Sequence, residues 1–166
     1  ARVRAIEPLS HDMALLHLQT PRTSRLRFLA GQYATVQLGK SLSADLPIAS
    51  CPCDERNLHF HVRRMPGNLF SDYVFNQLQC DEVVDVEGPQ GEFILQEKSP
   101  RPLYFIAFDT GFAPIKSLIE HAMSLDSAEA IHLYWIGSDE DSIYMPNMGR
   151  AWADALDNFF FFTRVS

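Results

Sequence analysis

The sequence contains no long uninterrupted hydrophobic run, and no basic start followed by an apolar segment and a cleavage site. The first absence argues against a membrane-spanning helix, and the second against a secretory signal peptide in this sequence. Basic residues are also few, since 14 lysines and arginines stand against 21 aspartates and glutamates, for a net charge of −7. Such an acidic balance disfavours binding to nucleic acid or to an anionic membrane. We therefore expect a cytoplasmic protein whose partners include neither.

Cysteine is scarce as well. Cys51, Cys53 and Cys80 are the three in the sequence, and they lack the four-ligand spacing of zinc and iron–sulfur sites. Cys51-Pro52-Cys53 is a weak metal motif, and the sequence places no carboxylate or cysteine beside His59 and His61. We expect reduced thiols and no bound metal.

The chain does have enough apolar material for a real core, because 46% of its 166 residues are hydrophobic and 21% are charged. Its periodicity changes at residues 98–102, which contain two prolines. We predict two domains on either side of this point, at residues 1–98 and 99–166.

Short segments with alternating apolar residues dominate before the divide. They predict strands at 13–18, 33–38, 58–62 and 83–86, separated by Gly, Pro, Asn and Asp, which is typical of a small antiparallel β-barrel. One helix is predicted at 70–78, where Asn68 or Ser71 can cap the first turn.

Continuous apolar runs alternate with helical patterns after the divide. They predict strands at 103–108, 131–136 and 159–165, with helices at 113–123 and 148–156. Such alternation indicates a parallel sheet buried on both faces, in a β-α-β-α-β unit. The fold class is therefore mixed: an antiparallel β-barrel followed by a truncated α/β half domain.

The first strand of this unit leads into Ala107-Phe-Asp-Thr-Gly-Phe-Ala-Pro114. A strand, a tight turn and a helix start with Pro114 in the first turn present free backbone N–H groups to an anion. The turn therefore predicts a nucleotide-phosphate site, although any α/β protein contains strand-turn-helix units. Lys116 is expected on the surface of the helix rather than at a phosphate.

Six short motifs, in a fixed order over nearly the whole chain, resemble the ferredoxin–NADP reductase superfamily, most closely its flavin reductases and oxygenase reductase components. The motifs are Leu29-Ala-Gly-Gln-Tyr33, Ile48-Ala-Ser50, Leu58-His-Phe-His-Val-Arg63, Gly67-Asn-Leu-Phe-Ser71, Gly88-Pro-Gln-Gly-Glu-Phe93 and Thr110-Gly-Phe-Ala-Pro114. The resemblance implies a flavin-binding barrel followed by a nicotinamide-binding domain, and FAD or FMN with NADH or NADPH as cofactors.

The resemblance also implies site residues. Ser50 is expected as the catalytic hydroxyl near the reactive flavin nitrogen, with the backbone of Ile48 and Ala49 along the ring. The other expected cofactor-binding residues are His61, Val62 and Arg63 on a strand, Gly67, Asn68, Leu69, Phe70 and Ser71 at a phosphate, and Thr110, Gly111, Ala113 and Pro114 at the nicotinamide nucleotide. A strand-end serine, a solvated edge strand and a plain helix cap are the alternative interpretations.

The sequence departs from the family pattern at three places. Residues 44–47 read Ala44-Asp-Leu-Pro47 where the family has an arginine, a spacer, an aromatic residue and a serine or threonine. Losing the arginine removes a bidentate phosphate partner, and Asp45 adds a negative charge. Phe108 and Asp109 replace paired glycines, which hinders close approach of a pyrophosphate. The acidic stretch at 137–141 favours NADH over NADPH.

Two functions follow from these patterns. The first is a flavin-dependent NAD(P)H oxidoreductase that passes electrons to an oxygenase, a ferredoxin or another acceptor. The second is a non-catalytic interaction or regulatory subunit that keeps the fold without tight cofactor binding. A sheet that ends at the 159–165 strand leaves apolar surface uncovered, so we expect either a fragment or a partner chain over it.

Overall fold

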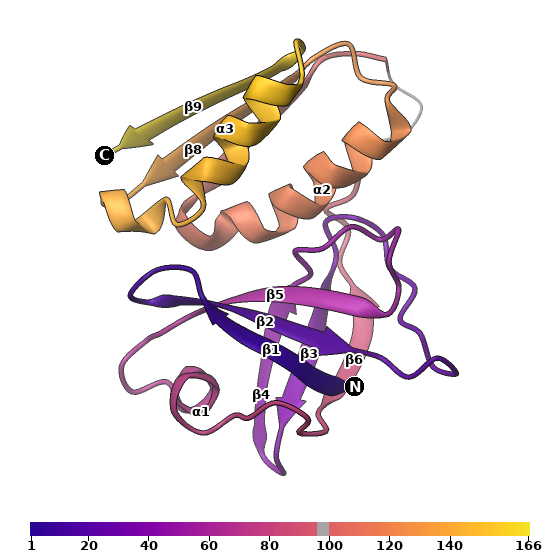
Figure 1. Cartoon of the computed structure of the whole chain (residues 1–166), viewed down its shortest axis with the longest axis vertical. Helices are drawn as coiled ribbons and strands as arrows, with labels where there is room; N and C mark the ends of the chain where they lie inside the picture. The colour runs from indigo at the N-terminus through magenta and orange to yellow at the C-terminus, as the bar shows by residue number, and fades with distance from the viewer. Residues whose placement is uncertain (96–99) are drawn as a thin grey trace.

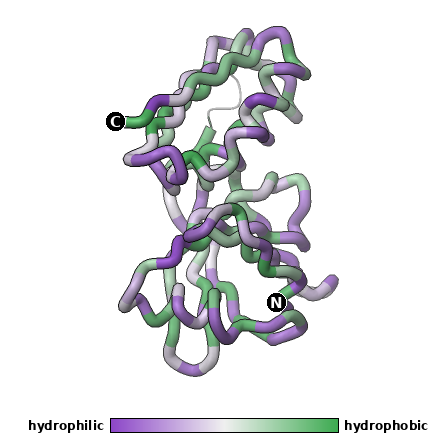
Figure 2. Tube along the Cα trace, turned by 60° about the vertical axis from the view of Figure 1, so that its left-hand side comes forward, coloured by the Kyte–Doolittle hydropathy of each residue, from purple (hydrophilic) through white to green (hydrophobic). Residues whose placement is uncertain are grey.

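The computed structural model describes residues 1–95 and 100–166 as a barrel joined to an α/β half (Figure 1). The predicted domain boundary at 98–99 lies outside these residues. Hydrophobic stretches run through both parts of the trace (Figure 2). They form two clusters of buried side chains, one centred in each part.

The barrel consists of antiparallel strands in the orders β1-β2-β5 and β4-β3-β6 within the described residues. Leu16, Val36 and Phe60 lie in its core with no exposed surface. The elements are β1 (Arg2–Pro8), β2 (Met13–Gln19), β3 (Tyr33–Leu38), β4 (Leu42–Pro47), β5 (Asn57–Arg63), α1 (Leu69–Asn76) and β6 (Asp85–Gln90). The barrel confirms the predicted fold class.

Two barrel strands, β1 and β4, were missed by the sequence prediction. Each mixes apolar with polar or charged residues, and most of its residues are exposed or half-buried. Such strands lack the clear apolar alternation on which the prediction depends. The strand predicted at 83–86 is shifted along the chain. The observed strand β6 begins at Asp85, and Val83 makes one isolated bridge to Arg2.

The α/β half contains the parallel sheet β7-β8-β9 with α2 and α3 as crossovers. Its elements are β7 (Leu103–Phe108), α2 (Phe112–Leu125), β8 (Ile131–Gly137), α3 (Pro146–Ala155) and β9 (Phe159–Val165). This confirms the predicted β-α-β-α-β unit.

Both helices cover the same face of this sheet (Figure 1). Trp135 of β8 is fully buried there and stacks on Phe112 of α2, with the ring centroids 3.9 Å apart. The opposite face is open. On β7 alone, Tyr104, Ile106 and Phe108 are 64%, 57% and 63% exposed. The expectation of a sheet buried on both faces is therefore wrong for these residues, because each strand buries alternate side chains and no described element covers the others.

Candidate cofactor site between the barrel and the α/β half

The segment after β4 forms the contact surface between the two halves. Ile48 and Ala49 are completely buried, and Ser50 is almost so. The N–H of Ile48 donates to the Gln32 carbonyl at 3.0 Å, and the N–H of Ala49 donates to the His59 carbonyl at 2.8 Å. The Ser50 hydroxyl accepts the His59 N–H at 3.1 Å and still has a proton to donate. Its expected role toward a flavin stays a prediction.

Two side chains of α2 hold this segment from the other side. Lys116 Nζ donates to the Ala49 carbonyl at 3.2 Å, and the Ser117 hydroxyl donates to the Ser50 carbonyl at 2.7 Å. Lys116 also forms an ion pair with Glu120 one turn later. The expectation that Lys116 lies on the helix surface is wrong, because the barrel covers this face of α2 and supplies a carbonyl acceptor for the ammonium.

His61 lies on the outer face of β5, where the α/β half packs against it. Phe60 and Val62 point into the barrel core, as the alternation predicts. The Nδ1 atom of His61 forms a 2.8 Å hydrogen bond with the Tyr144 hydroxyl, while its buried Nε2 has no partner. Burial lowers the pKa of His61 to about 3, and the positive charge of Lys116 adds to this shift. A neutral, enclosed His61 rules out the solvated-edge interpretation at this position.

Arg63, the last residue of β5, joins three segments. Its Nε lies 3.3 Å from Asp12 of the β1–β2 turn, and its Nη1 lies 3.9 Å from Asp109 of the turn after β7. The Asp109 carboxylate also accepts the N–H of Ser138 at 2.8 Å. The negative charge that the sequence placed at the nucleotide turn is therefore already paired with an arginine and a backbone donor.

Asp109 has a left-handed backbone conformation. Its φ is 49°, a left-handed value that aspartate tolerates better than most residues. Asp109–Gly111 form a short 3-10 turn from which α2 starts. Thr110 and Pro114 are half-buried, Gly111 is exposed and Ala113 is buried. The strand-turn-helix geometry predicted for this motif is present, and its binding role stays a prediction.

The turn into α1 is the second predicted phosphate site. Gly67 has a φ of 83° and open space around its α-carbon, and residues 64–69 are exposed. Asn68 Oδ1 caps the helix by accepting the Ser71 N–H at 2.9 Å. Ser71 is buried, and its hydroxyl accepts a hydrogen bond from the Met65 N–H. Phe70 lies in the barrel core. Of the five predicted residues, Gly67, Asn68 and Leu69 therefore line the exposed turn, and the other two anchor it.

The position of the missing arginine lies on β4. Ala44 and Leu46 share one face of the strand and pack against the edge of the barrel core. Asp45 points to the opposite, exposed face, where its carboxylate accepts the Thr35 hydroxyl at 2.5 Å. The Asp45 charge is thus directed away from the face of β4 that carries Ala44 and Leu46.

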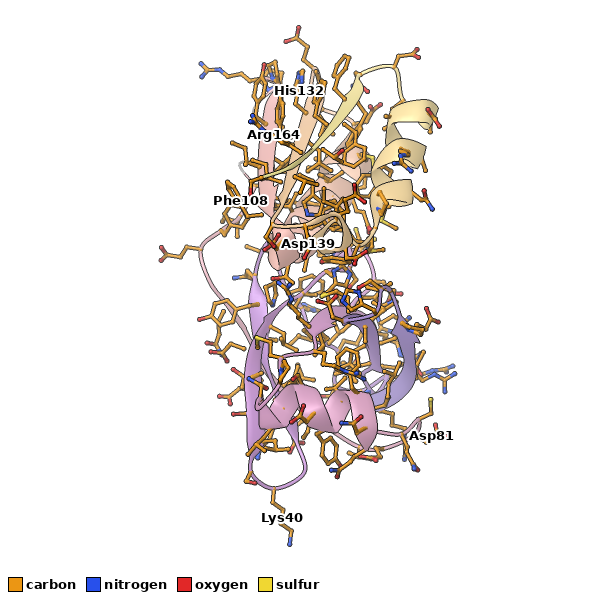
Figure 3. The ribbon with its side chains drawn as sticks, turned by 90° about the vertical axis from the view of Figure 1, so that its left-hand side faces the viewer. Lys40, Asp81, Phe108, His132, Asp139 and Arg164 are labelled. Carbon is orange, nitrogen blue, oxygen red and sulfur yellow. The ribbon has the colours of Figure 1, made fainter. Side chains whose placement is uncertain are left out.

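A cleft of about 550 Å³ lies between the β1–β2 turn and the carboxyl ends of the α/β strands. Leu9 and Ser10 line it from the barrel, whereas Asp141, Tyr144 and Arg150 line it from the α/β half. Asp139, beside this cleft in the sequence, lies at the junction of the two parts (Figure 3). Clefts at the carboxyl ends of parallel strands are where α/β folds bind ligands.

Neither a metal centre nor a membrane helix is found among residues 1–95 and 100–166. No three His, Cys, Asp or Glu side chains are grouped there to hold a metal ion, and no helix is long and apolar enough to cross a bilayer. His59, considered above as part of a metal pair, packs edge-on against the His17 ring at 4.7 Å.

Comparison with known proteins identifies the barrel. Residues 1–94 match the family described as oxidoreductase FAD-binding domain. The chain belongs to this FAD-binding domain family. It is 32% identical to the CDP-6-deoxy-L-threo-D-glycero-4-hexulose-3-dehydrase reductase of Yersinia pestis, over 99% of this chain and 49% of that protein. It is 31% identical to the NAD(P)H-flavin reductase of Vibrio harveyi, over 96% of this chain and 69% of that protein.

Solved structures share the fold of this FAD-binding domain protein. It superimposes on the cytochrome P450 reductase GcoB of Amycolatopsis with a TM-score of 0.89 and 25% identity, over 99% of this chain and 50% of that one. The chain spans about half the length of the first curated relatives it matches. The resemblance stated from the motifs is confirmed.

The described residues of the FAD-binding domain fit FAD in part. The exposed turn at Gly67 and the guanidinium groups of Arg63 and Arg64 suit an anionic phosphate. Arg64 lies 4.6 Å above the Phe75 ring and is exposed. Ala44 and Leu46 supply neither a charge nor an aromatic surface.

Sequence reasoning found the segments of this site but missed several side chains that hold them together. Lys116, Ser117 and Tyr144 bond across the two halves, and Asp12 pairs within the barrel with Arg63. The one sequence signal for Lys116 is that it belongs to a helix start next to a predicted cofactor segment. Nothing in the pattern around Asp12 or Tyr144 indicates a partner.

Proposed function

We propose that this chain provides the flavin domain and part of the nicotinamide domain of an NAD(P)H-dependent flavin oxidoreductase. The observation that carries the proposal is how the two predicted cofactor segments are joined. The turn after β7 is tied to the barrel of an FAD-binding domain by the Arg63–Asp109 ion pair, and α2 by the Lys116–Ala49 hydrogen bond. A nicotinamide nucleotide at that turn would lie next to a flavin on the barrel.

In this proposal the protein positions the cofactors. Gly67, Asn68 and Leu69 with Arg63 hold the flavin phosphates, and Ile48, Ala49 and Ser50 lie along the ring. Thr110 and Gly111, with Ala113 and Pro114 behind them, present the helix start to the nicotinamide nucleotide. Bound FAD supplies the ability to take a hydride and release single electrons. The paired Asp12–Arg63–Asp109 network fixes the relative position of the two segments.

Two further features complete the proposal. Glu140 and Asp141 line the cleft at the carboxyl ends of the strands, and their charge supports NADH over NADPH. The relatives include reductase components such as that of the terephthalate 1,2-dioxygenase of Comamonas. We therefore propose an electron-acceptor protein as partner, a further polypeptide segment or partner chain over the open sheet face, and a cytoplasmic location.

The alternative function, a non-catalytic subunit, is favoured by Ala44 and Leu46. One experiment separates the two. Folded, monodisperse protein is mixed with excess FAD, passed through gel filtration and examined by visible absorption. Retained stoichiometric flavin that NADH reduces supports the oxidoreductase. Flavin-free protein supports the interaction subunit.

The arginine position makes a quantitative prediction. We expect Ala44→Arg to tighten FAD binding about ten- to a hundredfold, since a charge-assisted hydrogen bond contributes about 1.5–3 kcal/mol. Fluorescence titration with FAD measures the dissociation constant. Ser43→Arg is the matched control, because it adds the same charge to the exposed opposite face of β4. Equal gains in both variants would mean that Ala44 does not face the phosphate.

A further inference from the structure

Cys51 and Cys53 occupy one tight turn directly after the contact segment. The Asp54 N–H donates to the Cys51 carbonyl at 3.2 Å, which closes a turn with Pro52 and Cys53 at its centre. The Cys53 N–H donates to the Cys51 sulfur at 3.3 Å, so this sulfur already lies over the backbone of the second cysteine. The Cys51-Pro52-Cys53 motif therefore places two thiols in one closed turn, with the Cys51 sulfur against the backbone of Cys53.

The distances in such a turn suit a covalent bond. Two virtual bonds of about 3.8 Å separate the α-carbons of residues two apart, and folding of the chain shortens their span into the range of about 4.4–6.8 Å found in disulfides. Rotation of the exposed Cys53 side chain is the movement that remains. The Cys53 N–H gives up its contact to sulfur when this happens and is free to bind water.

The two thiols differ in a way that suits sequential reaction. Cys51 is buried, whereas Cys53 is exposed. Burial, together with the Cys53 side chain and the negative charge of Glu120, raises the pKa of the Cys51 thiol. Cys51 is thus protected from direct attack by an oxidant in solution, and Cys53 is accessible.

We propose that Cys51 and Cys53 form a reversible, peroxide-driven disulfide. The Cys53 thiolate attacks hydrogen peroxide, which forms an S–O bond, breaks the O–O bond and releases one water after protonation. The Cys51 sulfur then attacks the Cys53 sulfenic acid; the S–S bond forms, and hydroxide leaves with the Cys51 proton as a second water. Two electrons pass from the sulfur pair to the peroxide, and a dithiol reductant returns both thiols by exchange.

The position of this pair connects it to the rest of the molecule. The carbonyls of Ala49 and Ser50, which accept hydrogen bonds from Lys116 and Ser117 of α2, lie two residues and one residue before Cys51. A ring closed across Cys51-Pro52-Cys53 restricts the backbone next to these two bonds. The disulfide would therefore lie next to the hydrogen bonds that join the barrel to the α/β half.

The test is alkylation of the full chain with iodoacetamide under denaturing conditions, followed by intact-mass and peptide mass spectrometry. Untreated protein should take up three alkyl groups, one for each cysteine. Protein treated with hydrogen peroxide should take up one, at Cys80, with the loss of two hydrogen atoms in the peptide that contains Cys51 and Cys53. Dithiothreitol should restore all three.

Two variants make the test decisive. Cys80→Ser removes the other exposed thiol and should leave the internal disulfide intact. Cys51→Ala removes the resolving thiol, so peroxide should carry Cys53 on to sulfinic acid, two oxygen atoms heavier. Two results would overturn the proposal. One is sulfinic acid at Cys53 of the wild-type chain while Cys51 remains a free thiol that iodoacetamide alkylates, and the other is a disulfide between two chains.

Discussion

Replacing Gly31 with alanine is expected to lower the free energy of unfolding by about 3 kcal/mol or more, the largest single-residue effect that we predict. Gly31 has a φ of 96°, where a side chain is strained, and a β-carbon added there would lie 1.7 Å from the Phe93 carbonyl oxygen. Left-handed strain and overpacking each cost about 1–3 kcal/mol. Neither obstacle is a flexible side chain that can simply rotate away.

Gly31 matters because two segments far apart in the sequence meet there. Gln32 holds them together, since its Oε1 accepts the Leu29 N–H at 2.8 Å and its Nε2 donates to the Gly91 carbonyl at 3.0 Å. Phe93 and Leu118 of α2 both lie where a β-carbon on Gly31 would point. A β-carbon at position 31 would therefore push apart the barrel and the segment that leads to the α/β half.

Urea unfolding followed by tryptophan fluorescence and circular dichroism measures this loss. Gly39→Ala is the matched control, because Gly39 also has a positive φ, 59°, but nothing lies within 4 Å of an added β-carbon. The control should cost about 1 kcal/mol from backbone strain alone. Equal losses in the two variants would show that contact with Phe93 plays no part.

Stability is expected to fall as the pH drops from about 6.5 to about 5, and His61 should account for about 2 kcal/mol of the loss. Burial lowers the pKa of His61 to about 3 and that of His59 to about 4, in both cases assisted by Lys116. His17 also faces His59, and Tyr144 faces His61. Protons therefore bind to these rings in the unfolded chain at a pH where the folded chain excludes them.

The direction of this pH dependence follows from the number of protons that each state binds. Below the unfolded pKa of 6.5 the unfolded state binds more protons than the folded state, so the free energy of unfolding rises with pH in this window. The window for His61 runs from 6.5 down to about 3, and 1.5 pH units of it correspond to about 2 kcal/mol. His59 adds a smaller loss of the same sign because it is partly solvated. Hydrogen bonds from Asn57 lower the pKa of Asp54 below its ordinary value, so this carboxylate stays ionised between pH 6.5 and pH 5.

Urea titrations at about pH 7 and about pH 5 test this expectation. The double variant His61→Phe/Tyr144→Phe removes both partners of the buried hydrogen bond and keeps a ring against Phe112, so it should fold and should lose the His61 share of the pH dependence. His11→Gln, at an exposed histidine, should behave as wild type. A wild-type pH dependence in the double variant would contradict the assignment to His61.

The open face of the β7-β8-β9 sheet carries an ordered set of aromatic rings. His132 stacks between Tyr104 and Phe160, with centroid distances of 4.5 and 4.8 Å, and Tyr134 stacks on Phe162 at 5.0 Å. Phe108 projects outward at the edge of this surface (Figure 3). Apolar surface of this extent is typical of a contact area, which agrees with the proposed cover by a further segment or a partner chain.

The sequence alone determined the elements with strong periodicity and the family. The strands at 33–38, 103–108 and 159–165 end where the pattern predicted, since apolar repeats and Gly or Pro breaks are local signals. The six ordered motifs gave the fold of the barrel. They could not give β1 or β4, whose residues alternate weakly between buried and exposed positions.

Tertiary structure decided what each polar residue touches. Lys116 donates a hydrogen bond to the Ala49 carbonyl, 67 residues away in the sequence. His61 forms a hydrogen bond with the hydroxyl of Tyr144, which is 83 residues away. It also made Cys51 buried and Cys53 exposed within one turn, and it paired Asp109 with Arg63. A helical or strand pattern shows which face of an element is polar. What covers that face, and therefore whether a charge is solvated, paired or suppressed, depends on contacts that exist only once the barrel and the α/β half have packed together.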